Sequence, residues 1–230
     1  METARGLAAL FSTQLELSRL DEQKELLRKA ELQALQAQIN PHFLFNAINT
    51  IVSLIRTEPE KGRKLLLHLG TFYRNNLQSG AMSVPLETEI NHIKSYLEIE
   101  HARFGDRLEI RYDIAEDLNL SIPPLLLQPL VENAVIHGIQ PRPEGGRITI
   151  SASTTEEGFI LTVNDNGLGL GEYQPAFCED SDVGPSDSIG LKNIRRRLLN
   201  TYGPSADLQL ECADGNGTTA RIFIPQGEVQ

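Results

Sequence analysis

The chain has 230 residues, which is enough for one large domain or two small ones. Hydrophobic residues make up 40% and charged residues 23%, as in an ordinary soluble globular protein, and the formal charge of −10 disfavours a broad nucleic-acid-binding surface. The two cysteines, Cys178 and Cys212, fit neither a disulfide framework nor a metal-ligand spacing, and no apolar run is long enough to cross a bilayer.

The first 55 residues are predicted to be helical. Leu, Ala, Gln, Glu and Lys dominate, with a single glycine (Gly6) and a single proline (Pro41). Apolar residues recur at intervals of seven and of three or four, at Leu10, Leu17, Leu20, Leu27, Leu32, Ala34, Leu35, Ile39 and Phe43. Such spacing is typical of a coiled coil or of a helix packed on its own domain. We favour a dimer seam over residues 10–39, because no sheet precedes it in the sequence.

The remaining chain predicts more helices and then a mixed α+β region. After a turn at 57–62, helices are expected at 63–77 and 86–104, and a helical domain should end near Gly105. Beyond it we expect strands at 108–114, 148–153, 159–165, 206–212 and 218–225, and helices at 123–137 and 188–199. Residues 167–187, rich in Gly, Pro, Asp and Ser, read as a loop. Paired strands with helices on one face predict an α+β sandwich.

The first stretch that carries chemistry is Gln-Ile-Asn-Pro-His-Phe-Leu-Phe-Asn at 38–46. A proline inside a helix removes a backbone hydrogen bond and kinks the helix, which would present His42 to a moving partner. A neutral imidazole is a competent nucleophile at cytoplasmic pH. The alternative is a packed histidine that donates to a backbone carbonyl.

The second stretch, Leu-Val-Glu-Asn-Ala-Val-Ile-His-Gly at 130–138, carries Glu132 and Asn133 in an otherwise apolar helix. Buried and unpaired, each would cost about 1–3 kcal/mol, so both should have partners. An asparagine oxygen suits Mg²⁺, which takes few protein ligands when phosphates supply the rest. The alternative is a helix end with polar caps.

Two glycine-containing stretches follow. At 164–171 the sequence Asn-Asp-Asn-Gly-Leu-Gly-Leu-Gly comes directly after a strand, where Asp165 can accept a hydrogen bond from an exocyclic amine. At 188–193, Ser-Ile-Gly-Leu-Lys-Asn enters a helix, whose first N–H groups can bind phosphate. Either stretch by itself could be an ordinary turn.

In this order, the four stretches resemble the LytS/YehU-type sensor histidine kinase family. They are similar to its phosphoacceptor box, its asparagine box and the two glycine boxes of Bergerat-fold (GHKL) ATPases. The segments 96–105 and 215–225 also match, so the resemblance covers most of the chain. It implies a signalling coiled-coil helix at 1–30, a dimerisation and phosphoacceptor domain at 31–105, and an ATP-binding α+β sandwich at 106–227.

The resemblance also implies a role for each site residue. His42 accepts the γ-phosphoryl group of ATP, Asn133 coordinates Mg²⁺, Asp165 binds the adenine amino group and Thr218 supports the adenine site. Gly167, Gly169 and Gly190 would frame a lid over ATP, and Leu191 would contact the nucleotide. Lys192 would reach a phosphate and His137 would touch the phosphates; the alternatives are a solvated lysine and a packed histidine. Phe43 follows His42 where many histidine kinases have an acid. The group that accepts the proton from His42 is therefore not identified by the motif, and Glu132 is the candidate. Ile136 and Ser188 are further departures from the frequent family residues.

The predicted function is therefore ATP-dependent autophosphorylation of His42, followed by transfer to an aspartate on the receiver domain of a response regulator. The expected assembly is a homodimer through the N-terminal helices, with no nucleic-acid partner. The chain would be the cytoplasmic portion of a receptor whose membrane sensor region lies outside it. Two other hypotheses are a non-catalytic dimeric scaffold that binds ATP or ADP, and a Bergerat-fold ATPase or serine kinase without histidine chemistry.

Overall fold

The computed structural model describes residues 19, 24, 25, 40–77, 81–116, 118–169, 188–212 and 217–226. The predicted coiled-coil seam therefore lies outside the described residues, apart from three helical positions, and so does most of the predicted loop at 167–187. The chain divides into two compact units, residues 1–45 and 46–230. In the described part, no helix combines the length and the apolarity that a membrane span requires.

Helix α2 (Pro41–Thr57) begins at the proline that was expected inside a helix. Asn40 is not helical, and its side-chain oxygen accepts a hydrogen bond from the backbone N–H of Phe43 at 3.1 Å. This is an N-terminal cap followed by proline at the first helical position, where the missing N–H costs nothing. The interior kink predicted at Pro41 is thus corrected to a helix start.

Three further helical segments complete the N-terminal half. Only Glu58 separates α2 from α3 (Pro59–Leu77), so α3 begins four residues earlier than predicted. Helix α4 (Leu86–Phe104) has the predicted bounds and runs into a short 3₁₀ turn, η1 (Gly105–Arg107).

Helix α3 packs against α4 through aromatic side chains. The Phe72 ring lies 5.0 Å from the His92 ring and 5.8 Å from the Tyr96 ring, centroid to centroid. His92 Nε2 is also 3.1 Å from the Phe72 carbonyl, so a buried imidazole is satisfied across the interface.

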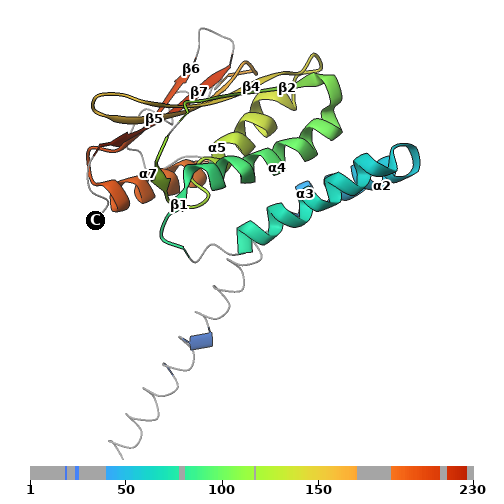
Figure 1. Ribbon diagram of the computed structural model, residues 1–230, viewed down its shortest axis with the longest axis horizontal. Coiled ribbons are helices and arrows are strands. Elements are labelled where there is room, and N and C mark those ends of the chain that lie inside the picture. Colours follow the sequence, from blue (N-terminus) through green and yellow to red (C-terminus); the bar gives the residue numbers. More distant parts are fainter. Residues whose placement is uncertain are drawn as a thin grey trace, which may run out of the picture. The chain divides into compact units, whose positions relative to one another are not determined.

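A five-stranded mixed sheet forms the centre of the C-terminal region (Figure 1). Its order is β2 (Leu108–Ile114), β4 (Gly146–Thr154), β5 (Gly158–Asp165), β7 (Thr218–Pro225) and β6 (Asp207–Cys212). β2 pairs with β4 in parallel and every other neighbour is antiparallel, which confirms the predicted β6–β7 hairpin. A two-stranded sheet that was not predicted joins β1 (Val84–Pro85) to β3 (Ser121–Ile122).

Helices α4, α5 (Gln128–Asn133) and α7 (Ser188–Tyr202) lie on one face of this sheet, as Figure 1 shows. A π-helix, η2 (Ala134–Ile139), continues directly from α5 and contacts β4 and β5. Fully buried side chains come from both layers: Ile148, Ile150 and Leu161 from the sheet, and Leu97, Val131, Val135 and Leu198 from the helices. The predicted α+β sandwich is confirmed.

The predicted helix over 123–137 is wrong in its first turn. Residues 123–127 form a turn in which Leu125 has φ 58°, and the helix begins only at Gln128. Pro124 disfavours helical backbone at the residue before it, and Pro129 is the proline that occupies the first helical turn. The last residues, up to Ile139, follow i→i−5 bonding, as in the bond from Gln140 N–H to the Val135 carbonyl at 2.8 Å.

Candidate active site

Asp165 is the last residue of β5 and is only 4% exposed. Its Oδ1 accepts a hydrogen bond from Gly167 N–H at 2.8 Å, and the backbone N–H of Thr218 also bonds to its carboxylate. Burial raises the pKa of Asp165, while these two N–H bonds oppose the rise. A carboxylate has about four acceptor positions, so two backbone donors leave capacity for a ligand.

Glycines surround Asp165 because the backbone comes too close for side chains. A Cβ on Gly138 would lie 2.6 Å from Asp165 Oδ1, and one on Gly167 would lie 2.3 Å from the Cα of Gly138. Any larger residue would push η2 away from the end of β5. The third stretch and the asparagine-box stretch are thus brought together at one point.

Thr218 and Gly169 complete this end of the sheet. Thr218 is the direct partner of Asp165 in the β5–β7 ladder. Gly169 has φ 75°, and a Cβ there would lie 3.1 Å from Cys212 Sγ and 3.2 Å from the Gly217 carbonyl. The predicted adenine residues Asp165 and Thr218 therefore adjoin, with Gly169 beside the turn that leads into β7.

Glu132, Asn133 and His137 lie where α5 passes into η2. Asn133 is the last residue of α5 and is half-buried, and His137 is exposed on η2. A π-helical segment widens the turn and is frequent at functional sites. Because Gly138 packs on Asp165, the helix that carries Asn133 ends against the adenine-site residues.

Glu132 belongs to a polar cluster of buried and half-buried residues, which we define as Tyr73, Tyr96, Glu100, Arg103, Gln128 and Glu132. Its Oε1 accepts a hydrogen bond from Gln128 Nε2 at 2.5 Å, and burial raises the pKa of Glu132. Burial raises the pKa of Tyr73, a residue of α3, and charge on Glu132 raises it further. The candidate base is therefore in electrostatic contact with the second helix of the predicted phosphoacceptor domain.

Gly190, Leu191 and Lys192 occupy the first turns of α7, as the sequence predicted. Gly190 has no heavy atom within 4 Å of the place where a Cβ would be, so its glycine is not required by packing among the described residues. Leu191 is half-buried and Lys192 is exposed.

His42 is the second residue of α2 and its side chain is exposed. It belongs to the unit of residues 1–45, whereas all other predicted site residues belong to residues 46–230. The imidazole is therefore not sealed in a core, while its role as phosphoacceptor stays a prediction.

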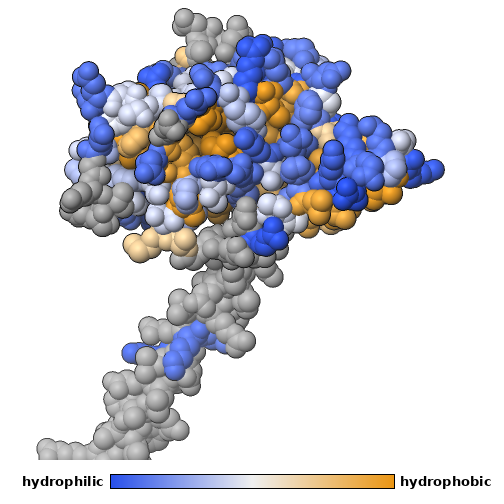
Figure 2. Space-filling model, viewed as in Figure 1, coloured by the Kyte–Doolittle hydropathy of each residue, from blue (hydrophilic) through white to orange (hydrophobic). Residues whose placement is uncertain are grey.

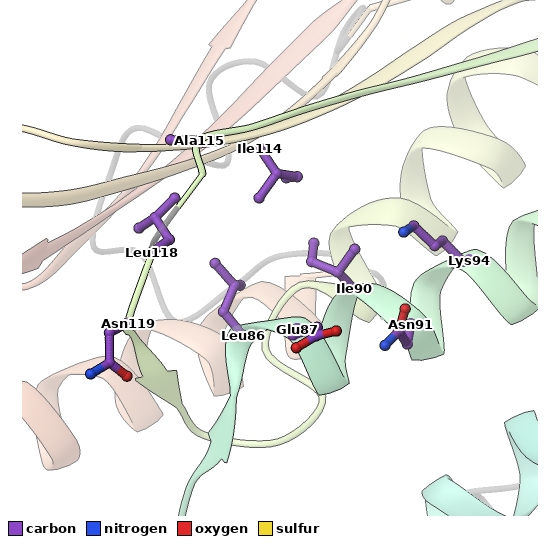
Figure 3. Close-up of a pocket in the computed structure, with 9 residues that line it drawn as sticks. All are labelled: Leu86, Glu87, Ile90, Asn91, Lys94, Ile114, Ala115, Leu118 and Asn119. Carbon is purple, nitrogen blue, oxygen red and sulfur yellow. The ribbon is translucent and has the colours of Figure 1, made fainter.

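A pocket of about 560 Å³ lies between α4 and the chain that follows β2 (Figure 3). Ile90 and Leu118 give it an apolar wall, while Glu87, Asn91 and Lys94 line its α4 side. None of the predicted site residues lines it. The pocket is therefore separate from the Asp165 neighbourhood.

Several residues of the candidate site were not singled out from the sequence. Gly138 was visible as the end of a quoted motif, but its contact with Asp165 was not predictable from spacing. Asn166 accepts a hydrogen bond from Arg147 N–H at 2.6 Å, and the Arg142 guanidinium donates to the Asn166 carbonyl. These bonds connect the residue after β5 to the start of β4 and to the loop after η2.

The comparison with known families agrees with this geometry. The profile of the family described as "Histidine kinase" matches residues 30–108, and that of "Histidine kinase-, DNA gyrase B-, and HSP90-like ATPase" matches residues 123–228. Sensor proteins match nearly the whole chain at about 40% identity. This chain belongs to the LytS-type sensor histidine kinase family. The ATPase match implies ATP use.

The similar proteins are much longer than this chain. The sensor histidine kinase YpdA of Escherichia coli is 42% identical over 97% of this chain and 39% of its own length. The sensor protein LytS of Staphylococcus haemolyticus is 41% identical over 100% of this chain and 40% of its own length. The chain thus spans about two fifths of these curated relatives. A solved histidine kinase domain from Erythrobacter litoralis aligns over 84% of this chain and 92% of that one, at 20% identity and a TM-score of 0.47.

Proposed function

We propose that this chain is the kinase core of a two-component system, which phosphorylates its own His42 and passes the phosphoryl group to an aspartate of a response regulator. The observation that carries the proposal is the buried Asp165 carboxylate, which keeps acceptor capacity at a point where Gly138 and Gly167 admit no side chain. In a chain of this family, such a site suits the adenine of ATP.

Asp165 and Thr218 are proposed as the adenine residues. The exocyclic amine of adenine would donate to the Asp165 carboxylate, whereas guanine presents a carbonyl at the same position and would face another acceptor. Thr218 supports the site because its backbone N–H bonds to the same carboxylate. ATP should therefore be preferred over GTP.

Asn133 is proposed as the protein ligand of Mg²⁺. No group of three or more His, Cys, Asp or Glu among the described residues is arranged to hold a metal ion. An ion bound mainly by phosphates and water needs only one or two protein oxygens, so the Asn133 amide fits this role. When bound, Mg²⁺ neutralises charge on the phosphates during phosphoryl transfer.

His42 is proposed to attack the γ-phosphorus, so that a phosphorus–nitrogen bond forms, the bond to the bridging oxygen breaks and ADP leaves. The imidazole must then lose a proton, and Glu132 remains the candidate acceptor. Its raised pKa makes the carboxylate a stronger base than an exposed glutamate. Gly167, Gly169 and Gly190 would frame a lid, and Leu191, Lys192 and His137 would contact the nucleotide.

We propose a signalling coiled-coil helix at 1–30, a dimerisation and phosphoacceptor domain at 31–105 and an ATP-binding domain at 106–227. The two family matches, at 30–108 and 123–228, support this division. Dimerisation is proposed through the hairpin of α2 and α3. Large apolar side chains stay exposed there, as Figure 2 shows along the lower edge of the hairpin: Ile48 43%, Val52 55%, Ile55 52%, Leu66 57% and Leu67 60%. The 48, 52, 55 spacing is that of a helical seam, which a second copy would cover.

A cytoplasmic location is proposed because ATP and response regulators are found in the cytoplasm. We further propose that a membrane sensor region, outside this chain, controls the kinase. The length of the relatives, of which this chain spans about two fifths, supports a larger receptor.

One labelling experiment tests the proposal. The protein is incubated with γ-labelled ATP and Mg²⁺, and the label on the chain is then exposed to acid and to alkali. Phosphohistidine is lost in acid and stable in alkali, so we expect acid-labile label on the wild type and none on His42→Gln. His68→Gln, a change of a half-buried histidine on α3, is the matched control and should retain the label.

Other outcomes separate the alternatives. Acid-stable label would indicate a serine or threonine acceptor. Nucleotide binding without any label would favour a non-catalytic scaffold. Equal labelling of His42→Gln and the wild type would exclude His42 as the acceptor.

A further inference from the structure

Glu89 is a buried acid of α4 that the proposed reaction does not use. It is 2% exposed, and its carboxylate spans the turn that leads into α5. Oε2 accepts a hydrogen bond from the backbone N–H of Leu125 at 2.9 Å, and Oε1 accepts from those of Leu127 at 3.1 Å and Gln128 at 3.3 Å. One side chain thus holds three backbone donors that lie 36–39 residues further along the chain.

The turn that Glu89 holds is not stable by its own local chemistry. Leu125 has φ 58°, a left-handed conformation that costs a residue with a side chain about 1–2 kcal/mol. The cap residue of α5, Leu127, provides no side-chain cap, and the first N–H groups of a helix have no partners within it. Glu89 therefore supplies from α4 the cap that the local sequence lacks, and its negative charge suits a helix N-terminus.

The helix that starts at this turn is short and ends at Asn133. It has six residues, so its first and last residues are about 8 Å apart along the axis. Beyond Asn133, η2 is fixed by the contact of Gly138 with Asp165. The position of Asn133 is therefore defined by two anchors, Glu89 before it and Asp165 after it.

We propose that Glu89 is a positioning residue, which sets where the Asn133 amide meets the metal ion of bound Mg²⁺·ATP. This inference rests on the proposed role of Asn133. Burial raises the pKa of Glu89, because it disfavours the charged carboxylate, and the backbone N–H bonds oppose this rise. Three charge-assisted hydrogen bonds to one turn explain why a carboxylate is useful at this buried position.

Glutamine at position 89 would preserve the shape of the side chain but disrupt its hydrogen bonds to the turn at 125–128. A glutamine has one acceptor oxygen, and its NH₂ group would face backbone N–H donors that now bond to the second carboxylate oxygen. The turn at 125–128 would then lose at least one partner, and α5 would be free to shift.

The test compares nucleotide binding with and without metal in the 230-residue chain. Dissociation constants for ATP are measured by calorimetry in Mg²⁺ and in EDTA, for the wild type, Glu89→Gln, Asn133→Ala and Glu87→Gln. The gain in affinity that Mg²⁺ provides should fall about tenfold in Glu89→Gln, as when the support of a metal ligand is removed. Metal-free affinity should stay within about twofold, because Asp165 is unchanged. Glu87→Gln, an exposed neighbour on α4, should behave as the wild type.

The two proposals fail in different ways. If Asn133→Ala keeps the full Mg²⁺ gain, the assignment of Asn133 as metal ligand is wrong. If Asn133→Ala loses the gain and folded Glu89→Gln keeps it, Asn133 stands and the positioning role of Glu89 is overturned. Equal weakening of ATP binding in Mg²⁺ and in EDTA would likewise overturn it, because that is the result of general structural damage.

A second measurement uses the wild type alone, so it tests the positioning role of Glu89 even if Glu89→Gln does not fold. Amide hydrogen exchange of the wild type is followed at Leu127 and Gln128, the donors held by Glu89. Because coupling between sites is reciprocal, Mg²⁺·ATP should slow exchange there more than metal-free ATP does. Equal protection by the two forms would overturn the proposal.

Discussion

Asp165 shows how one residue can combine a structural and a selective role. Its carboxylate is 4% exposed, and backbone N–H groups of Gly167 and Thr218 fix its orientation. Because these donors hold the carboxylate in one orientation, its remaining acceptor positions face a fixed direction. The carboxylate cannot rotate to suit a different nucleotide base. Selectivity for adenine would thus follow from the surrounding backbone as well as from the acid itself.

Asp165→Asn should weaken ATP binding about 10- to 100-fold, because the amide cannot accept from the backbone and from adenine at once without leaving a buried polar group unpaired. Calorimetry would measure the loss, and thermal unfolding would show that the variant is folded. Asp113→Asn, an exposed change on β2, is the control and should bind ATP as the wild type does. Wild-type affinity in Asp165→Asn would contradict the adenine assignment.

At the scale of elements, a partly buried polar contact joins α4 to Gln140, the residue that follows η2. Arg103 Nη1 lies 3.0 Å from Glu100 Oε2, and Arg103 Nη2 donates to Gln140 Oε1 at 3.3 Å. Burial raises the pKa of Glu100 to about 6, which the Arg103 guanidinium opposes and the charge of Glu132 favours. The ionised Glu100 is therefore a cost to the folded protein at neutral pH, and it keeps an arginine ordered between helices.

This arrangement predicts a pH dependence of stability. The folded pKa of Glu100 is higher than the unfolded one, so its cost is full above about pH 6 and disappears as the pH falls to about 4.5. Between pH 7 and 4.5 the wild type should gain about 1.5 kcal/mol of unfolding free energy relative to Glu100→Gln. Urea unfolding at both pH values measures this difference, with Glu98→Gln, an exposed change on the same helix, as control. Parallel pH profiles for the wild type and Glu100→Gln would contradict the prediction.

At the scale of the whole molecule, the proposed reaction brings together residues that belong to two different compact units. His42 lies in residues 1–45, and the candidate nucleotide residues lie in residues 46–230. Phosphoryl transfer depends mainly on alignment and charge neutralisation, so a kinase of this kind needs a scaffold that lets the two parts meet. The exposed apolar seam of α2 and α3 is the surface from which such a dimeric scaffold would be built.

Ile48→Glu combined with Val52→Glu should therefore disrupt the dimer. In a symmetric dimer each charge is buried twice, so the dissociation constant should rise at least about 100-fold. Sedimentation analysis measures the change, and Ser53→Glu, an exposed polar position of the same helix, is the control. ATP binding should persist in the monomer, because Asp165 lies on β5 and not on the substituted helix α2. An unchanged dimer would place the interface elsewhere.

Local patterns were sufficient for much of the fold and for the composition of the site. The bounds of α4, β2 and β7 were predicted correctly, because amphipathic period and strand alternation are properties of neighbouring residues. The sequence motifs also contain Asp165 and Thr218, which are direct partners in the β5–β7 ladder. The roles of the site residues remain predictions.

Tertiary structure decided what local sequence left open. The parallel pairing of β2 with β4 joins residues nearly forty positions apart, and the left-handed turn at Leu125 exists because Glu89 on α4 supplies its hydrogen bonds. Proline placement alone suggested a longer helix there. The sequence by itself therefore determined which groups the chain offers, while the closeness of Gly138 to Asp165 and of Glu89 to α5 depended on packing. Such contacts join segments that are distant in sequence, and no local periodicity reports them.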